Sequence, residues 1–246
     1  MIEQGPHGDR AMRGTIRRRL LVNALVDPVE AARRLPAGLR PHLIDGGTVV
    51  GCCLLDIASI RPASLPAGVG THLRAAAHRV SVEWDDEAGS TIVGVYVPVR
   101  HTDSRAARVL GGRWFPGVHR RASIELTDDG RSLRWLVEPS DRATQYGVSV
   151  SATIISTSSP ERCEPIGGTC LRATVGLSPD RHGALEAAQM VPEHRSALQV
   201  EIDYLDSCFL AGFTTAERAP SYFMRDVDVT WTKVRPPRLA LTETLT

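Results

Sequence analysis

Apolar and polar residues alternate along most of this chain, and this period of two constrains its fold more than any other feature. Residues 78–84 place two valines and a tryptophan at every second position, with polar side chains between them. The same alternation recurs at 133–137, 148–154, 198–204 and 227–231. Side chains alternate between the two faces of a β-strand, and clusters of Gly, Pro and Asp between the stretches are typical of turns. The sequence therefore predicts a mainly β (α+β) protein with an antiparallel sheet, closed or strongly curved because closure removes unpaired edges.

Three short helices are expected outside this sheet. The first follows Asp27, a common N-cap residue, and the second follows a cap at Asp103 or Ser104. The expected helices cover residues 28–35, 104–110 and 183–190.

The length and composition fit one domain. A chain of 246 residues, of which 42% are hydrophobic, can bury a core of ordinary size. Residues 1–14 are polar and Gly-rich and predict a flexible N-terminus, and residues 237–246 follow a Pro-Pro pair with little to bury. We therefore expect a single domain over residues 15–236.

Charge and apolar content exclude several classes of protein. The formal net charge is +1, so the chain lacks the basic surplus that nucleic acid or an anionic membrane would attract. Residues 1–14 hold no apolar signal-peptide segment, and no apolar run approaches the roughly 20 residues that cross a bilayer. We expect a cytoplasmic protein that binds neither nucleic acid nor membrane, and a homo-oligomer is left open.

The usage of cysteine and lysine is unusual. The five cysteines are odd in number and match no zinc-binding spacing, and Cys52 and Cys53 lie in an apolar run that predicts buried thiols. Lys233 is the only lysine, and arginine supplies the other cationic side chains. Codon bias explains this preference better than anion binding by arginine, because the arginines are spread along the sequence.

Several common catalytic motifs are missing from the sequence. It contains no phosphate-binding loop, no complete dinucleotide-binding glycine motif and no Gly-x-Ser-x-Gly segment. No histidine pair stands at the helical spacing of a zinc protease. We expect no metal and no cofactor.

The densest group of chemistry-bearing residues is the segment GGRWFPGVHRRA, residues 111–122. His119 fits two roles, an acid–base group whose pKa nearby cations would lower, or a strand-start histidine bonded to backbone. Arg120 and Arg121 alternate along a strand, which leaves one of them to hold a carboxylate or enolate oxygen. Arg113 is a second candidate for binding an anion.

Glu83 is a second candidate proton carrier, provided that the polar face of its strand lines a cavity. If that face meets water, Glu83 is an ordinary surface carboxylate. Arg79 and His78 lie beside it in the sequence and join it as candidate substrate-binding residues. Four aromatic residues are expected to form the core and the wall of the site: Trp84, Tyr96, Trp114 and Phe115.

Four segments together resemble an uncharacterised domain-of-unknown-function branch of the acetoacetate decarboxylase-like superfamily. They are residues 18–46, 77–84, 95–119 and 222–231, with the Leu-Pro-x-Gly-Leu-x-Pro turn and the Gly-Gly-Arg segment as specific features. The resemblance implies a cone-like antiparallel β-barrel with a few outer helices and a ligand cavity inside the cone. It places His119 or Arg120 on the floor of that cavity.

The catalytic lysine of this superfamily is missing here. In acetoacetate decarboxylase a lysine just after the Gly-Arg segment forms an imine with the keto acid, whereas residues 118–121 read Val-His-Arg-Arg. An imine needs a primary amine that can lose its proton, which neither guanidinium nor imidazole supplies. Lys233 is then either a substitute nucleophile or a strand-end lysine that reaches into water.

Two functional hypotheses follow. The first is an acetoacetate decarboxylase-like enzyme of lyase or isomerase type, as found in secondary metabolism, acting on a small carboxylate or polyketide-like carbonyl compound without a lysine imine. Dehydration, isomerisation, aldol-type and cyclisation reactions all fit, with His119 and Glu83 moving protons and Arg120 or Arg113 stabilising an enolate. The alternative is a non-catalytic protein that binds a small molecule in the same cavity. A scaffold without a ligand would instead fill the cone with side chains.

Overall fold

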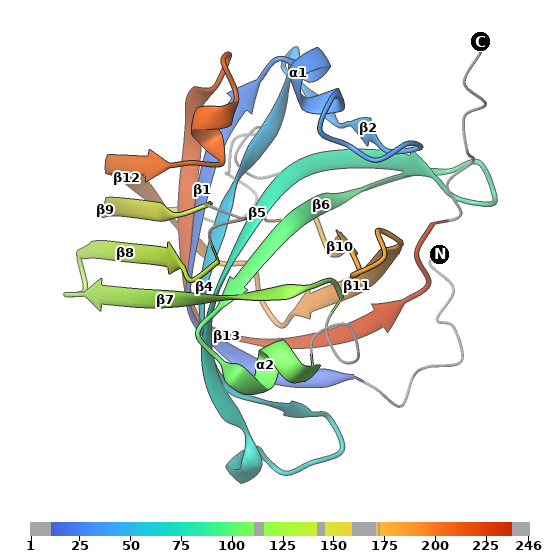
Figure 1. Cartoon of the computed structure of the whole chain (residues 1–246). Coiled ribbons are helices and arrows are strands. Elements are labelled where there is room, and N and C mark those ends of the chain that lie inside the picture. The colour runs from blue at the N-terminus through green and yellow to red at the C-terminus, as the bar shows by residue number, and fades with distance from the viewer. Residues whose placement is uncertain (1–10, 111–115, 142–145, 159–170, 172, 238–246) are drawn as a thin grey trace.

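The computed structural model describes residues 11–110, 116–141, 146–158, 171 and 173–237. In these ranges the chain forms one sheet of 13 strands and a few short helices (Figure 1). The elements of the first half are β1 (Met12–Val26), α1 (Pro28–Ala32), β2 (Arg40–Pro41), β3 (Leu43–Ile44), β4 (Gly47–Pro62), the 3-10 turn η2 (Ala67–Val69), β5 (Thr71–Asp85), β6 (Thr91–Thr102) and α2 (Arg105–Leu110). Those of the second half are β7 (His119–Asp128), β8 (Ser132–Pro139), β9 (Val148–Ser158), β10 (Val175–Pro179), β11 (Leu185–Pro192), β12 (Ala197–Ser207), the 3-10 turn η4 (Leu210–Gly212) and β13 (Glu217–Val234).

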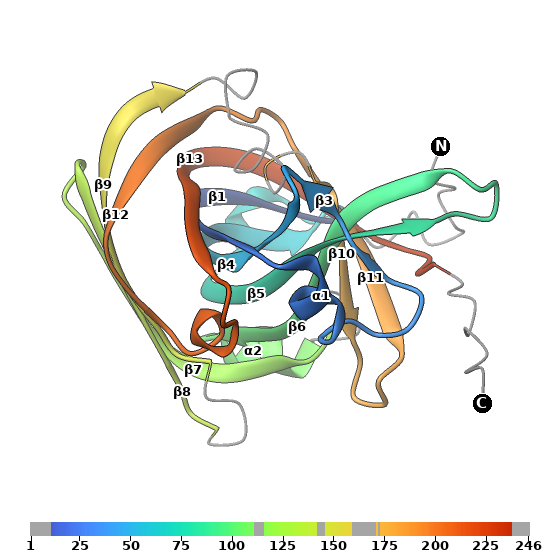
Figure 2. The ribbon, with the colours of Figure 1, turned by 90° about the horizontal axis from the view of Figure 1, so that it is seen from above.

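The sheet closes on itself in two ways. Its strand order is β11-β10-β6-β7-β8-β9-β12-β13-β1-β4-β5-β2, and the additional pairings β11–β13 and β6–β5 complete two rings. One ring contains β10 and β11, the other contains β7, β8, β9 and β12, and both share the strands β13-β1-β4-β5-β6 (Figure 2). The pairings are antiparallel except for β6 with β7 and with β10. The predicted mainly β fold, closed into a cone-like barrel with few helices, is confirmed.

The shared strands are unusually long and are buried on both faces. β4 has 16 residues and β13 has 18, against a typical strand of about 5–6. Register shifts in the pairings of β1, β4, β5 and β6 bend these strands, which allows the same strands to serve both rings.

Each face of the shared strands packs against a different core. On one face, neighbouring strands contribute side chains to a cluster with the β7–β9 and β12 strands, among them Leu20, Cys52, Leu54, Ala76, Trp135, Leu133 and Phe223. On the opposite face the next residues along the strands form another cluster, among them Leu21, Cys53, Ala77, Val97, Met224 and Val229. The predicted burial of both Cys52 and Cys53 is confirmed. The burial of both faces explains how a polar residue of a shared strand can lie inside the protein.

Two of the three expected helices are present. Asp27 caps α1 by accepting hydrogen bonds from the backbone nitrogens of Val29 and Glu30, as predicted. At α2, Ser104 rather than Asp103 accepts from a backbone nitrogen of the helix, while Asp103 accepts from the backbone nitrogen of Arg74 on β5. None of the helices in the described ranges is long and apolar enough to cross a membrane.

The expected helix at 183–190 is wrong. The region forms a hairpin of β10 and β11, whose turn is built by Asp180 accepting from the backbone nitrogens of His182 and Ala184. β11 also pairs with β13, so backbone hydrogen bonds on both sides override the local preference for helix. At the other end of the chain β1 begins at Met12, which makes residues 12–14 part of the sheet rather than of a flexible N-terminus.

Candidate functional site

One row of side chains crosses six strands on a single face of the sheet. Residues directly opposite each other on neighbouring strands share a face, and the pairings run without interruption from β13 through β1, β4, β5 and β6 to β7. This central row consists of Tyr222, Leu21, Cys53, Ala77, Arg100 and His119. It brings together residues from both ends of the chain, and it contains the histidine that the sequence singled out.

Arg100 lies deep in this row. Its Nε donates a hydrogen bond to Ser178 Oγ on β10 at 3.1 Å. Gly176, also on β10, lies beside the guanidinium, since a β-carbon there would meet Arg100 Nη2 at an ordinary contact distance of 3.6 Å. Burial lowers the pKa of Arg100 to about 10, although part of this residue remains accessible to solvent.

His119 stands directly opposite Arg100 in the parallel pairing of β6 and β7. Burial lowers the pKa of His119 to about 3, and the charge of Arg100 adds to this effect, while the backbone of Pro116 opposes it. The imidazole is therefore neutral near pH 7. The predicted position of His119 inside the protein is consistent with this geometry.

Arg19 occupies the next row toward one end of the strands. It is 7% exposed, and its Nε donates to Cys53 Sγ at 3.2 Å. Its Nη1 lies 3.9 Å from Met224 Sδ. Both acceptors are sulfur atoms, which are weak partners for a guanidinium.

Arg79 occupies the row on the other side, opposite Gly51 and, through it, Asn23. Its side chain is 2% exposed, and Nη2 donates to Asn23 Oδ1 across the position where Gly51 has no side chain. Asn23 in turn donates through Nδ2 to the backbone oxygen of Pro220 at 2.7 Å. Three consecutive rows on this face thus each hold an arginine, of which Arg19 and Arg79 are buried and Arg100 is partly buried.

Within the described part of the chain, Arg19 and Arg100 form no ion pair with a carboxylate. A buried guanidinium without a counter-charge is costly, and anionic oxygens are the ligands that best relieve that cost. This face is therefore a candidate anion-binding site with a neutral imidazole beside it.

Glu186 links the segment before His119 to the only lysine. Its Oε2 accepts from the backbone nitrogen of Gly117 at 2.8 Å, and its Oε1 accepts from Lys233 Nζ at 2.6 Å. Gly117 adopts a φ of +80°, and a β-carbon there would overlap Ser178, so a glycine is required at this turn. Glu186 and Lys233 therefore hold the turn that leads into β7.

Glu83 lies apart from this site. Its carboxylate is 27% exposed and faces Arg40 Nε at 3.4 Å and His42 Nδ1 at 3.2 Å, both on the segment that covers the edge of β5. The structure does not bring Glu83 to His119, and the arrangement matches the alternative of a surface carboxylate.

Three other predicted substrate-binding residues belong to a different environment. His78 is fully buried, with its ring 5.2 Å from that of Phe209 and 5.7 Å from that of His101. Trp84 and Tyr96 are buried in the cluster that also contains Val82 and Leu177. These three side chains form core rather than the surroundings of Arg100.

Of the remaining predicted substrate-binding residues, one lies at the surface and three lie outside the described ranges. Arg120 forms an ion pair with Asp141 at 2.9 Å, and both side chains are more than one-third exposed. It therefore points away from the central row, and His119 is the residue of that segment that lies inward. Arg113, Trp114 and Phe115 lie outside the described residues.

Sequence reasoning missed Arg19 and Arg100 as site residues. A signal was present, since Arg100 ends the apolar stretch VYVPVR and Arg19 precedes the apolar stretch LLV. An arginine at the end of an apolar strand is also common at the protein surface, so the signal alone does not decide its place.

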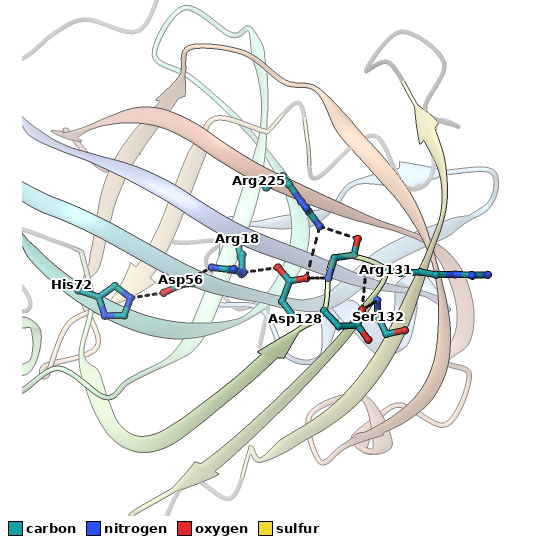
Figure 3. Close-up of polar contacts among 9 residues, drawn as sticks. Arg18, Asp56, His72, Asp128, Arg131, Ser132 and Arg225 are labelled. Atoms are coloured by element: carbon teal, nitrogen blue, oxygen red, sulfur yellow. Dashed lines mark hydrogen bonds and ion pairs between the residues drawn. The ribbon is translucent and has the colours of Figure 1, made fainter.

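A second polar cluster lies on the opposite face, at one end of the ring that contains β7 and β8. Figure 3 shows Arg18 between Asp56 and Asp128, at 3.2 Å from the first and 2.6 Å from the second. His72 pairs with Asp56, and Arg225 lies 3.8 Å from Asp128. The pocket there is lined by Arg17, Arg18, Asp128, Arg225 and Asp226. Arg18 and Arg225 thus each have a carboxylate partner, unlike Arg19 and Arg100 within the described residues.

No group of three or more His, Cys, Asp or Glu side chains suited to holding a metal ion occurs among the residues that the structure describes. No protein-family model matches the sequence, and no curated protein matches it.

Solved structures do match this chain in fold. Acetoacetate decarboxylase from Legionella pneumophila superposes with a TM-score of 0.59 and 14% identity, covering 93% of this chain and 88% of that one. The enduracididine biosynthesis enzyme MppR, complexed with pyruvate, gives 0.59 and 16%, covering 93% and 89%. An acetoacetate decarboxylase-like enzyme from Sphingomonas wittichii RW1 gives 0.60 and 14%, covering 96% of each chain. The chain thus has the acetoacetate decarboxylase fold, as the resemblance implied.

Proposed function

We propose that this chain is an enzyme that acts on a small compound carrying a carboxylate and a carbonyl group, by acid–base and enolate-stabilising chemistry without a lysine imine. The observation that carries the proposal is the pairing of Arg100 with His119 on one face of the sheet. It combines a desolvated cation for an anionic oxygen with a neutral imidazole for a proton. The match in fold to MppR complexed with pyruvate, itself a carbonyl-containing carboxylate, supports this class of ligand.

The two groups suit removal of a proton from the carbon next to a carbonyl. The guanidinium of Arg100 would hold the carboxylate or the developing enolate oxygen, and His119 would accept the proton. A bound anion would also offset the charge of Arg100, so that the imidazolium becomes less costly when substrate is present. Dehydration, isomerisation, aldol-type and cyclisation reactions all begin with such a step.

Lys233 gives further support for chemistry without an imine. Imine formation needs an amine that is free to attack a carbonyl, and Lys233 Nζ instead donates to the carboxylate of Glu186 at 2.6 Å. Treatment with borohydride in the presence of keto acids tests this directly. A trapped adduct on Lys233 would overturn the imine-free mechanism.

The second candidate is a binding protein that uses the same site without catalysis. Both ring nitrogens of His119 are enclosed. This favours binding without catalysis, because proton transfer requires one ring nitrogen to reach the substrate. Deuterium incorporation from heavy water into a panel of 2-oxo and 3-oxo acids, followed by NMR, separates the two. An enzyme accelerates exchange at the carbon next to the carbonyl, whereas a binding protein shifts the melting temperature without accelerating it.

The variants His119→Gln and Arg100→Gln are expected to lower the exchange rate by about 100-fold or more, the usual scale for a lost acid–base group or oxyanion donor. Arg120→Gln is the matched control, because its side chain pairs with Asp141 at the surface. Glu83 stays a predicted proton carrier, and Glu83→Gln tests it in the same assay. Unchanged exchange in His119→Gln would contradict the proposed role of the histidine.

A further inference from the structure

Arg19 and Arg100 approach the same thiol from two sides. Arg19 donates to Cys53 Sγ from β1, and Arg100 lies two strands from Cys53 in the central row, beyond the small side chain of Ala77. Burial dominates the lowered pKa of Arg100, and Cys53 opposes it in part, which shows that the guanidinium and the sulfur are electrostatic neighbours.

Both guanidinium groups keep unused donors. Arg19 uses Nε and Nη1 on sulfur atoms, and Arg100 uses Nε on Ser178. Arg19 Nη2 and both η nitrogens of Arg100 have no hydrogen-bond partner in the described residues. These atoms are also not among the enclosed polar atoms without a partner, so they retain accessible surface. Each guanidinium therefore keeps N–H groups that no described residue accepts from and that retain accessible surface.

The charges around these donors leave the face positive. Glu186 lies opposite Ser178, the hydrogen-bond partner of Arg100, and it is already paired with Lys233 and the backbone nitrogen of Gly117. Arg79, in the adjacent row, adds a third cation, and its Nη2 donates to the amide oxygen of Asn23. A ligand with a single carboxylate would leave one of the two guanidinium groups desolvated without a counter-charge.

We infer that the ligand of this site carries two anionic groups, one held by Arg19 and the other by Arg100, and is a keto dicarboxylate or a compound of equivalent charge. This inference rests on the proposed function and narrows its substrate class. A guanidinium donates charge-assisted hydrogen bonds to carboxylate oxygens, so each arginine can hold one carboxylate group through the η nitrogens that it keeps unused. The carbonyl of such a compound would lie between the two arginines, over Cys53 and Ala77.

Isothermal titration calorimetry with pairs of 2-oxo acids of equal chain length tests this inference. In each pair one compound ends in a methyl group and the other in a carboxylate, as in 2-oxopentanoate and 2-oxoglutarate. The wild-type protein is expected to bind the dicarboxylate of at least one pair about ten-fold or more tightly. Arg19→Gln and Arg100→Gln should each reduce that preference to near parity, whereas Arg120→Gln should keep it.

Equal affinities in every pair for the wild-type protein would overturn the inference, and this result does not depend on whether any variant folds. The proposed function would still stand if a monocarboxylate bound and exchanged its protons in heavy water. A preference that survives in both Arg19→Gln and Arg100→Gln would also overturn the assignment of the two arginines. Lack of binding by every compound would remove support from the inference and from the proposed function together.

Discussion

Arg100 and His119 lie directly opposite each other on the parallel strands β6 and β7, and the charge of the guanidinium contributes to the low pKa of the imidazole. The proposed function therefore couples anion binding to proton transfer in this site. Any ligand that neutralises Arg100 makes His119 a stronger base.

This coupling is measurable by histidine NMR. In Arg100→Gln the pKa of His119 should rise from about 3, because one cause of its low value is removed. It should remain below its ordinary value of 6.5, because burial is the larger cause. Arg120→Gln should leave the titration of His119 unchanged. A titration of His119 that is identical in Arg100→Gln and the wild type would contradict the coupling.

Burial of His78 should make the fold sensitive to acid. Burial, and then the neighbouring His101, lower the pKa of His78 from 6.5 to about 3. The unfolded chain therefore binds a proton more readily between these values, so stability is complete above pH 6.5 and falls as the pH drops toward 3. At 1.36 kcal/mol per unit, His78 alone costs roughly 2 kcal/mol between pH 7 and pH 5.

Urea denaturation of His78→Phe at both pH values tests this, since Phe fits the aromatic surroundings of Phe209 and Tyr146. The variant should lose about 2 kcal/mol less than the wild type between pH 7 and pH 5. The comparison is within each protein, so a change in packing that acts equally at both pH values does not affect it. Equal losses of unfolding free energy in the two proteins would show that protonation of His78 does not cause the loss of stability at low pH.

Glu186 should stabilise the turn that carries His119. Glu186→Ala removes the acceptor of both Lys233 Nζ and the Gly117 backbone nitrogen, and we expect a loss of about 1–3 kcal/mol in the free energy of unfolding. Glu186→Gln keeps an oxygen acceptor for one of these donors and should lose less. Chemical denaturation measures both. If the two variants have the same free energy of unfolding, an amide oxygen at this position does not restore the hydrogen bond to Gly117, and the prediction fails.

Gly51 should tolerate no side chain. A β-carbon there would overlap the backbone carbonyl oxygen of Val22, which cannot move without breaking the pairing of β1 with β4. We expect Gly51→Ala to cost about 3 kcal/mol or more, or to prevent folding. Gly68→Ala is the matched control, since a β-carbon at Gly68 meets nothing within 4 Å, and it should stay within about 0.5 kcal/mol of the wild type. Similar melting temperatures for the two variants would contradict the close approach at Gly51.

Much of the fold was predictable because its signals are local. The alternation in residues 133–137 predicted a strand with Leu133, Trp135 and Val137 on one buried face, and all three side chains are at most 1% exposed. The cap of α1 at Asp27 was readable for the same reason, since it depends on residues within one turn. The helix expected at 183–190 failed because β11 is stabilised by β10 and β13, and β13 lies far away in the sequence.

The candidate site was predictable only in part. The sequence indicated His119, and the resemblance left open whether His119 or Arg120 would lie on the floor of the cavity. Arg120 lies at the surface with Asp141, whereas His119 is desolvated beside Arg100. For Glu83, the sequence left open whether the polar face of its strand would line a cavity or meet water. In the structure, Arg40 and His42 of the covering segment are its partners.

The sequence by itself determined most of the extended segments, the cap of α1 and which residues of a strand share a face, because each depends on neighbours within a few positions. The tertiary structure alone decided that Arg19, Arg79 and Arg100 lie in consecutive rows on one face with His119. Which residues meet across a sheet depends on the register between strands, and closure of the two rings fixes that register through contacts between distant parts of the chain.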